Sequence, residues 1–223
     1  MIDRAERVSA LAGVLAVLLW VGGVVLIGGG HVGLPGGIPE ERADEVLSHF
    51  QGNADAAVSG GWLFMLGSLA FLWFIGILRG RLIRAEGGAE TFASIVFAGG
   101  VATGVLALGI PTGGVVAALG VDQLGASEAA ALNALEATFF IGAELAAIVL
   151  LAAAAVVALR TAVLPRWWAG ISILLAVWLA IGPIGWIGVL AGIPVWTITT
   201  SLILARADRY AQLPTVPATP ARF

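Results

Sequence analysis

Two glutamates and an asparagine lie inside an apolar segment, and they are the residues of this chain best suited to chemistry. Asn133, Glu136 and Glu144 belong to the segment 133–160, which is long enough to cross a bilayer. On a helix of 3.6 residues per turn they fall, with Phe140, within an arc of roughly 80°. An ionisable residue in a membrane segment is costly and marks a functional candidate. We therefore expect Glu144 and Glu136 to bind a cationic or hydroxylated ligand, to relay a proton or to act as a general acid.

The two faces of this predicted helix differ in the size of their side chains. Apart from Phe140 and Leu151, the face of the glutamates is small or polar and continues with Ala147, Ala154, Ala155 and Ala158. The opposite face is bulky and carries Leu135, Phe139, Leu145, Val149, Val156 and Val157. Because small residues let helices approach closely, we expect the first face to pack on other helices and the second to contact lipid.

Tryptophan and histidine supply the remaining candidates. Trp73 and Trp178 are predicted to lie deep in their spans, where they could line a pocket or donate a hydrogen bond to Glu144. His31 and His49 are the only histidines, and together with carboxylates they could form a metal site. Their spacing matches no ligand pattern, so we predict two exposed loop histidines and no metal.

The composition identifies the class of protein. Of 223 residues, 60% are apolar and only 11% are charged, whereas soluble domains carry about 25% charged residues. The apolar runs are too many for one water-soluble core of this size, so we predict an all-α, polytopic membrane bundle. A net charge of −3 without a basic cluster excludes nucleic acid as a partner. All eleven basic residues are arginine, a composition typical of GC-rich bacterial genomes and hence of a bacterial plasma membrane protein.

Apolar segments predict six spans, at about residues 8–27, 57–78, 92–110, 131–159, 167–182 and 185–205. The first is expected to remain uncleaved. The third is expected to end at Pro111 and the Gly113-Gly114 pair that follows it. The polar connection after the first span contains a predicted surface helix that ends at Gly52-Asn53. The region 207–223 contains three prolines and is predicted to be a disordered tail.

The distribution of arginine predicts the orientation of the chain. Cytoplasmic loops of membrane proteins are enriched in basic residues. With six spans and both termini in the cytoplasm, every arginine except Arg42 falls on the cytoplasmic side. An odd number of spans would destroy this asymmetry.

Glycines four residues apart occur in three predicted spans, as Gly76 and Gly80, Gly100 and Gly104, and Gly188 and Gly192. Each pair is expected to allow close helix packing within the chain, or else dimerisation. Motifs for soluble cofactors are missing: the chain has no phosphate-binding loop, no HExxH and no serine nucleophile motif. We therefore predict no cofactor and no coupling to ATP within this chain.

The step Leu164-Pro165-Arg166-Trp167-Trp168-Ala169-Gly170 resembles a feature of an uncharacterised group of bacterial, often actinobacterial, polytopic membrane proteins. The resemblance extends over residues 8–205 and includes a long outer connection and a late double apolar segment. It implies a helical membrane protein and transfers no activity and no catalytic residue.

These observations predict a protein that binds or transports a small hydrophobic or lipid-like molecule, in a cavity walled by the fourth span and anchored by Glu144. One alternative is an intramembrane enzyme acting on a lipid or isoprenoid, with Glu144 or Glu136 as general acid. Another is a subunit or assembly factor of a larger membrane complex. The expected partners are the bilayer, a lipid-like ligand and either a second copy or other membrane proteins.

Overall fold

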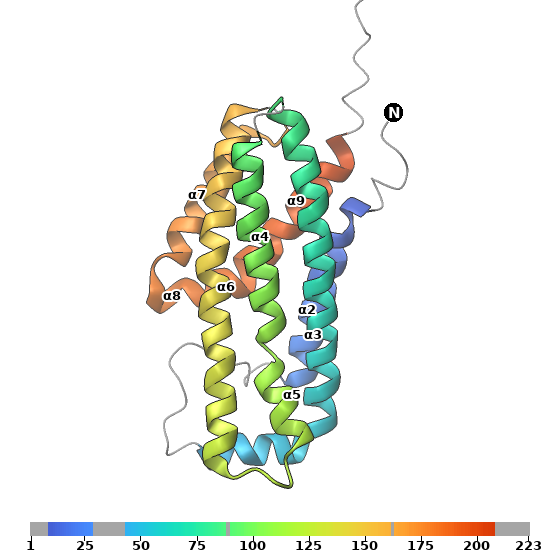
Figure 1. The fold of residues 1–223 in the computed structure, drawn as a ribbon, viewed down its shortest axis with the longest axis vertical. Coiled ribbons are helices and arrows are strands. Elements are labelled where there is room, and N and C mark those ends of the chain that lie inside the picture. Colours follow the sequence, from blue (N-terminus) through green and yellow to red (C-terminus); the bar gives the residue numbers. More distant parts are fainter. Residues whose placement is uncertain (1–8, 29–42, 88–89, 162, 208–223) are drawn as a thin grey trace, which may run out of the picture.

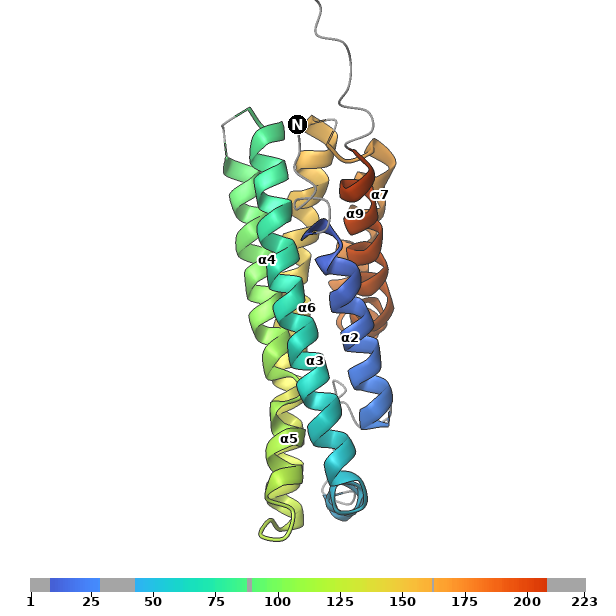
Figure 2. The ribbon, with the colours of Figure 1, turned by 90° about the vertical axis from the view of Figure 1, so that its right-hand side faces the viewer.

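The computed structural model describes residues 9–28, 43–87, 90–161 and 163–207, and within these ranges its elements are all helices. They pack side by side as an elongated bundle (Figures 1 and 2). In chain order they are α2 (Ala12–Ile27), α3 (Ala43–Ala85), α4 (Thr91–Gly109), α5 (Thr112–Leu119), α6 (Ala126–Arg160), α7 (Arg166–Leu179), α8 (Gly182–Ile187), a π-helical segment (Gly188–Gly192) and α9 (Ile193–Ala207). The predicted tail, the start of the first span and His31 lie outside the described residues.

Four helices are long and apolar enough to cross a membrane, namely Ala43–Ala85, Thr91–Leu119, Ala126–Arg160 and Ile184–Arg206. The helices Ala12–Ile27 and Arg166–Leu179 are apolar but shorter. The 16 residues of α2 extend about 24 Å at 1.5 Å per residue, less than the ~30 Å of a hydrocarbon core. Large apolar side chains cover the outside of the bundle, among them Leu18, Leu145 and Leu174. Such a surface is suited to contact with lipid.

The predicted surface helix forms the first part of α3. Asn53 has non-helical backbone angles, φ −135° and ψ 25°, so two helices meet there at a kink. Its side-chain amide donates a hydrogen bond to the carbonyl of His49 (3.0 Å). The segment before the kink crosses one end of the bundle, and the segment after it runs along the bundle (Figure 1). The predicted end at Gly52-Asn53 is therefore confirmed.

The helix of the third span ends at Gly109, next to the predicted end at residue 110, but a further helix, α5, follows Pro111. Proline lacks an N–H and interrupts the helical ladder, which ends α4 at Gly109. Its carbonyl nevertheless accepts a hydrogen bond from the N–H of Val115 (3.0 Å), which starts α5. The proline thus divides one long helical stretch in two and does not end it, and Gly113 and Gly114 lie in the first turn of α5.

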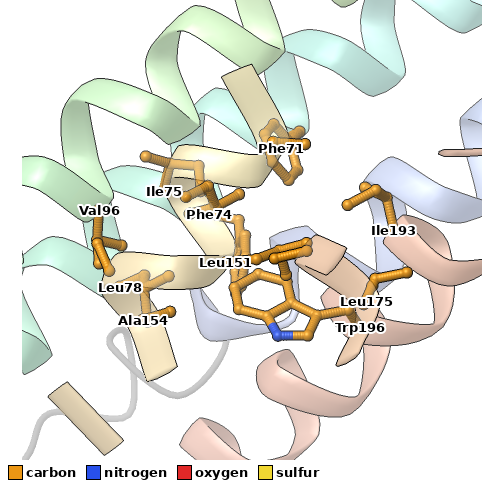
Figure 3. Close-up of a cluster of buried hydrophobic side chains, with 14 of the residues drawn as sticks. Phe71, Phe74, Ile75, Leu78, Val96, Leu151, Ala154, Leu175, Ile193 and Trp196 are labelled. Carbon is orange, nitrogen blue, oxygen red and sulfur yellow. The ribbon is translucent and has the colours of Figure 1, made fainter. Parts of the chain in front are cut away.

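The core of the described bundle is apolar and is built from residues of α2, α3, α4, α6, α7 and α9, part of which Figure 3 shows. Phe71 and Phe74 of α3 are fully buried, as is Leu151 of α6. Leu175 of α7 and Trp196 of α9 complete the labelled cluster in this view. The bulky residues of α3 thus pack where α6 presents alanine or leucine, and the remaining helices close around them.

Buried tryptophans join helices by donating hydrogen bonds to hydroxyl groups. The donor–acceptor pairs are Trp20 Nε1 to Ser68 Oγ (3.0 Å), Trp168 Nε1 to Thr200 Oγ1 (3.0 Å) and Trp196 Nε1 to Ser172 Oγ (2.9 Å). The first joins α2 to α3, and the other two join α7 to α9. Hydrogen bonds of this kind hold helices together in an environment without water.

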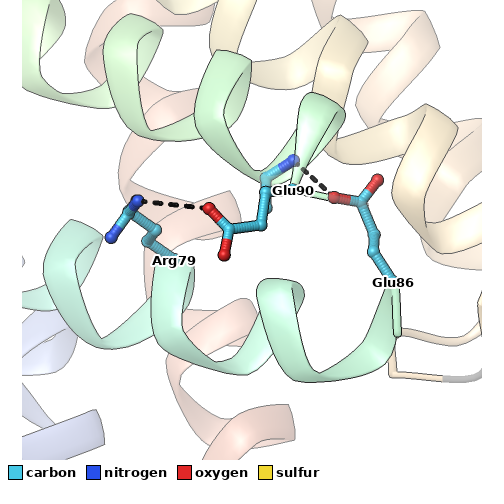
Figure 4. A network of polar contacts seen from close by, with 4 residues as sticks. Arg79, Glu86 and Glu90 are labelled. Atoms are coloured by element: carbon cyan, nitrogen blue, oxygen red, sulfur yellow. Dashed lines mark hydrogen bonds and ion pairs between the residues drawn. The ribbon is translucent and has the colours of Figure 1, made fainter. Parts of the chain in front are cut away.

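The two ends of the bundle differ in charge: one is rich in arginine and the other carries acidic side chains. The C-terminal ends of α3, α6 and α9 meet the N-terminal ends of α4 and α7 at one end (Figures 1 and 2). These ends carry Arg79, Arg81, Arg84, Arg160, Arg166 and Arg206. Arg79 pairs with Glu90 at 4.0 Å, and Glu86 Oε2 accepts the N–H of Ala93 (2.9 Å) at the start of α4 (Figure 4). The other end carries Asp44, Glu45, Asp55, Asp122 and Glu128.

The three glycine pairs have different surroundings. A Cβ added to Gly100 would lie 2.6 Å from Ile75 of α3, and one added to Gly192 would lie 2.4 Å from Leu175 of α7. These helices therefore pack closely at the glycines, as expected. A Cβ added to Gly76 or Gly80 would meet nothing within 4 Å. Close packing at this pair is therefore not found among the described residues.

Candidate functional site

The glutamate-bearing face of α6 is turned into the bundle. Asn133, Glu136 and Glu144 are all buried, and so are the small residues that continue this face. On the opposite face Leu135, Leu145 and Val149 are exposed, as the pattern predicts. Val157 is an exception, because it is fully buried where α6 is enclosed by other helices near its C-terminal end. Neighbouring helices, not lipid, therefore surround both carboxyl groups.

Glu136 is bonded to the first turn of α5. Its Oε1 accepts the N–H of Gly114 at 2.5 Å, and the side chain is only 4% exposed. The two glycines make this approach possible, because a Cβ on Gly113 would lie 2.1 Å from the carbonyl oxygen of Leu132. A helix N-terminus carries a partial positive charge and favours a negative partner. Glu136 thus accepts one of the N–H groups in the first turn of α5, which have no partner within the helix.

Glu144 lies two turns further along the same face of α6, against Gly185 of α8. It is 5% exposed, and its Oε1 has no hydrogen-bond partner among the described residues. A Cβ built on Gly185 would lie 1.7 Å from this oxygen and 2.7 Å from the carbonyl oxygen of Leu179. The carboxyl therefore lies directly against the backbone of α8.

A cavity of about 220 Å³ lies between α2, α4, α6 and the start of α9. We call it the lateral cavity. Its wall is formed by Trp20, Val21, Val24, Val25, Phe64, Thr103, Ala107, Ile110, Phe140, Ala143, Ala147, Val189, Leu190, Ile193 and Pro194. Val21, Val25 and Leu190 are also exposed on the outside of the bundle, so the cavity opens toward the lipid-facing surface.

The wall of the lateral cavity is almost wholly apolar. Only Trp20 and Thr103 bring polar side-chain atoms to it, and both use them elsewhere. The indole of Trp20 donates to Ser68, and the hydroxyl of Thr103 donates to the carbonyl of Gly99 (2.8 Å). An apolar cavity of about 150 Å³ can stay dry and hold a hydrocarbon. The lateral cavity is therefore suited to an apolar molecule or an apolar chain.

A π-helical segment forms one side of the lateral cavity. Pro194 has no N–H, so the carbonyl of Leu190 lacks the donor that an α-helix would supply at this position. Nearby, the N–H of Ile193 reaches back to the carbonyl of Gly188, one residue further than in an α-helix. Segments of this type occur often at functional sites. Here the segment brings Val189 and Leu190 into the wall.

A second, smaller cavity of about 20 Å³ adjoins the lateral cavity, and we call it the inner cavity. Both cavities include Phe64 and Ile110 in their walls. Glu136 supplies the acidic side chain of the inner cavity, and Phe50 of the surface helix covers it. The wall of the inner cavity therefore contains a buried carboxyl group, that of Glu136.

The structure separates the predicted site residues. Glu136 lines a cavity, whereas Glu144, which we expected to anchor the ligand, lines neither. Asn133 is buried one turn before Glu136 on α6. Trp178 donates its indole N–H to the carbonyl of Ile184 (3.2 Å), and Trp73 is 64% exposed on the outside of the bundle. Neither tryptophan is in the wall of the lateral or the inner cavity.

His49 packs edge-on against Phe50, with ring centroids 5.6 Å apart, and is partly buried. Among the described residues there is no group of three or more histidine, aspartate or glutamate side chains that could hold a metal ion.

Sequence reasoning missed most of the cavity wall. Trp20, Val24 and Phe64 are apolar residues in apolar helices, and no pattern distinguishes a cavity wall from a packed core. Pro111 and the following glycines do carry a signal. An apolar run of helix-forming residues, Val115 to Leu119, follows them, which is consistent with a helix that restarts.

No protein-family model, no curated protein and no solved structure matches this chain. The resemblance to an uncharacterised bacterial family therefore stays a prediction. The function has to be inferred from the geometry of the site.

Proposed function

We propose that this chain is a multi-pass protein of the bacterial plasma membrane that binds a small hydrophobic or lipid-like molecule in the lateral cavity. The observation that supports this most is the wall of the cavity. It is apolar, it opens between α2 and α9 toward the lipid-facing surface, and Phe140, Ala143 and Ala147 of α6 form its inner side. A molecule dissolved in the bilayer enters such a cavity without crossing water.

The proposed topology has six spans and both termini in the cytoplasm. Four long helices and the two shorter apolar helices supply the crossings. The end of the bundle with six arginines is the cytoplasmic end, because basic residues are retained on that side. The short α2 and α7 are accommodated by local thinning of the bilayer, at a modest cost per ångström of mismatch.

The geometry gives less support to the two alternative functions predicted from the sequence. An intramembrane enzyme needs a carboxyl group that meets its substrate; Glu144 lines neither cavity, and Glu136 lines only the inner cavity of about 20 Å³. A subunit of a larger complex would use the outer surface, for which Gly76 and Gly80 offer an open face on α3. Neither observation accounts for an apolar cavity.

The test is photolabelling with a twelve-carbon alcohol that carries a diazirine in its tail, on protein purified in a non-ionic detergent. We expect the label on residues of the lateral cavity, such as Val24 and Ile193. Ala143→Phe fills the cavity and should abolish this labelling. Ala152→Phe, on the exposed side of the same helix, is the matched control and should label normally.

Labelling that persists at full strength in Ala143→Phe would disprove the proposal. The smaller substitution Ala107→Leu, on α4, reduces the cavity from its other side and should weaken labelling in the same direction. If both variants label as the wild type does, the lateral cavity holds no ligand.

A further inference from the structure

The break between α7 and α8 brings a buried carboxyl group against the C-terminal end of a helix. A Cβ built on Gly185 of α8 would collide with Oε1 of Glu144 and would lie 2.7 Å from the carbonyl oxygen of Leu179, the last residue of α7. The two oxygen atoms therefore border the same small space beside the Cα of Gly185. Both are acceptors when the carboxyl is ionised, so this arrangement needs a donor.

The backbone around the break does not supply that donor. In an α-helix the carbonyl of Leu179 would accept the N–H of residue 183, but this residue is a proline and has none. The N–H groups of Ile184 (3.0 Å) and Gly185 (3.1 Å) both point to the carbonyl of Ile181. Oε1 of Glu144 has no hydrogen-bond partner in the part of the chain that the structure describes, although the residue is only 5% exposed.

The helices around the carboxyl do not bring a cation to it. Those with the main contacts to α6 are α3, α4, α5, α7 and α8. α4, α5 and α8 contain no titratable residue, and α3 has none between residues 56 and 78. The one titratable residue of α7 is Arg166, at its opposite end and about 20 Å away at 1.5 Å per residue. On α6, Glu136 lies two turns from Glu144, and Arg160 lies about 24 Å along the helix.

An ionised Glu144 would be unfavourable in this position. The C-terminal end of a helix carries a partial negative charge and repels a carboxylate. A buried charge without a partner also loses its hydration without compensation. A proton on Oε1 removes both costs, because the neutral carboxyl can donate its O–H to the carbonyl of Leu179. A proton needs no cavity, and Glu144 lines neither the lateral nor the inner cavity.

We propose that Glu144 and the carbonyl of Leu179 form a proton-binding site at this break. With the proton bound, the O–H of the carboxyl bonds to the carbonyl and holds α7 and α8 against α6. When the proton leaves for water, the carboxylate and the carbonyl oxygen repel each other, and α8 moves away from α6. The site lies behind the wall of the lateral cavity, to which Ala143 and Ala147 belong, and it does not depend on what that cavity binds.

Infrared difference spectroscopy on the protein in detergent tests whether the proton is present. A protonated carboxyl absorbs at a C=O frequency distinct from that of a carboxylate, and the band shifts in D2O. At neutral pH the wild type should show one such band that Glu144→Gln lacks. Glu128→Gln removes an exposed carboxyl from the same helix and is the matched control, which should keep the band. The band should be lost as the pH is raised.

Spin labels measure whether α8 follows the proton. The chain has no cysteine, so labels can be attached at the exposed positions of Leu159→Cys on α6 and Ile187→Cys on α8. Their separation should increase over the pH interval in which the band is lost. In Glu144→Gln the amide is close in size and supplies a permanent N–H donor, so the separation should keep its neutral-pH value. A second pair, at Leu145 and Leu159 of α6, should not change in either protein.

Four results would each overturn the inference. The first is a wild type without the band at neutral pH, which would mean that Glu144 is ionised. The second is a band that persists unchanged to the highest pH at which circular dichroism shows a folded protein. The third is a separation between α6 and α8 that stays constant while the band is lost. The fourth is an equal pH response of this separation in Glu144→Gln, which would assign the movement to another group.

Discussion

The carboxyl oxygen Oε1 of Glu144 lies against the Cα of Gly185, in the short helix α8 that follows α7. Glycine is required there for space, since a Cβ would lie 1.7 Å from Oε1 and 2.7 Å from the carbonyl oxygen of Leu179. This contact links the two halves of the last apolar stretch to α6. It explains how a polar side chain is accommodated inside the bundle although it lines no cavity.

Gly185→Ala should therefore destabilise the protein by about 1–3 kcal/mol, the usual cost of overpacking. Unfolding by denaturant in detergent micelles measures the change. Gly170→Ala is the control, because a Cβ at Gly170 on α7 meets nothing within 4 Å and alanine favours the helix. Adding Glu144→Ala to Gly185→Ala should restore only part of the loss, since the carbonyl of Leu179 is backbone and stays in place. Complete restoration would show that only the carboxyl matters.

Gly99→Ala on α4 should destabilise the bundle more than Gly76→Ala on α3. A Cβ at Gly99 would lie 2.7 Å from the backbone nitrogen of Leu150, so α4 and α6 would have to separate. A Cβ at Gly76 meets nothing, and alanine there should stabilise α3 by up to about 1 kcal/mol. The comparison uses the midpoint of denaturant unfolding for each variant. Equal effects at the two positions would contradict the packing of α4 on α6.

Ser172→Ala removes the hydroxyl that accepts the indole N–H of Trp196. Trp196 is almost completely buried, so its donor would lose its partner at a cost of about 1 kcal/mol. Thr199→Val, at a partly exposed position on α9, is the control and should change stability less. Unfolding of both variants in the same detergent gives the comparison. A Ser172→Ala variant as stable as the wild type would show that the bond between α7 and α9 contributes nothing.

Glu86→Ala should loosen the start of α4 and cost about 1 kcal/mol, since its carboxylate accepts the N–H of Ala93 as a helix cap does. Glu90→Gln should change stability by less than about 0.5 kcal/mol, because its pair with Arg79 is exposed and long at 4.0 Å. Hydrogen exchange of the first turn of α4 distinguishes the two. Faster exchange of these amides in Glu90→Gln than in Glu86→Ala would show that Glu90, and not Glu86, caps α4.

The sequence by itself determined the helical class, the end of the surface helix at Gly52-Asn53 and the buried face of α6. Each depends on composition or on a local period: apolar length predicts spans, and small or polar residues at helical spacing predict the face that packs. The same local reasoning predicted that the helix ends at Pro111. A helix does end there, at Gly109, but α5 was missed, because a proline ends one hydrogen-bonded ladder without preventing the next from starting.

Only the tertiary structure decided which carboxyl group meets a cavity. Glu136 and Glu144 are two turns apart on one face and equivalent by residue type, burial and spacing. Their difference comes from neighbours distant in the chain: Gly114 and Phe50 beside Glu136, and Gly185 beside Glu144. The lateral cavity likewise arises where four helices fail to fill the space between them. No single segment contains that information, because a void is a property of how several elements pack.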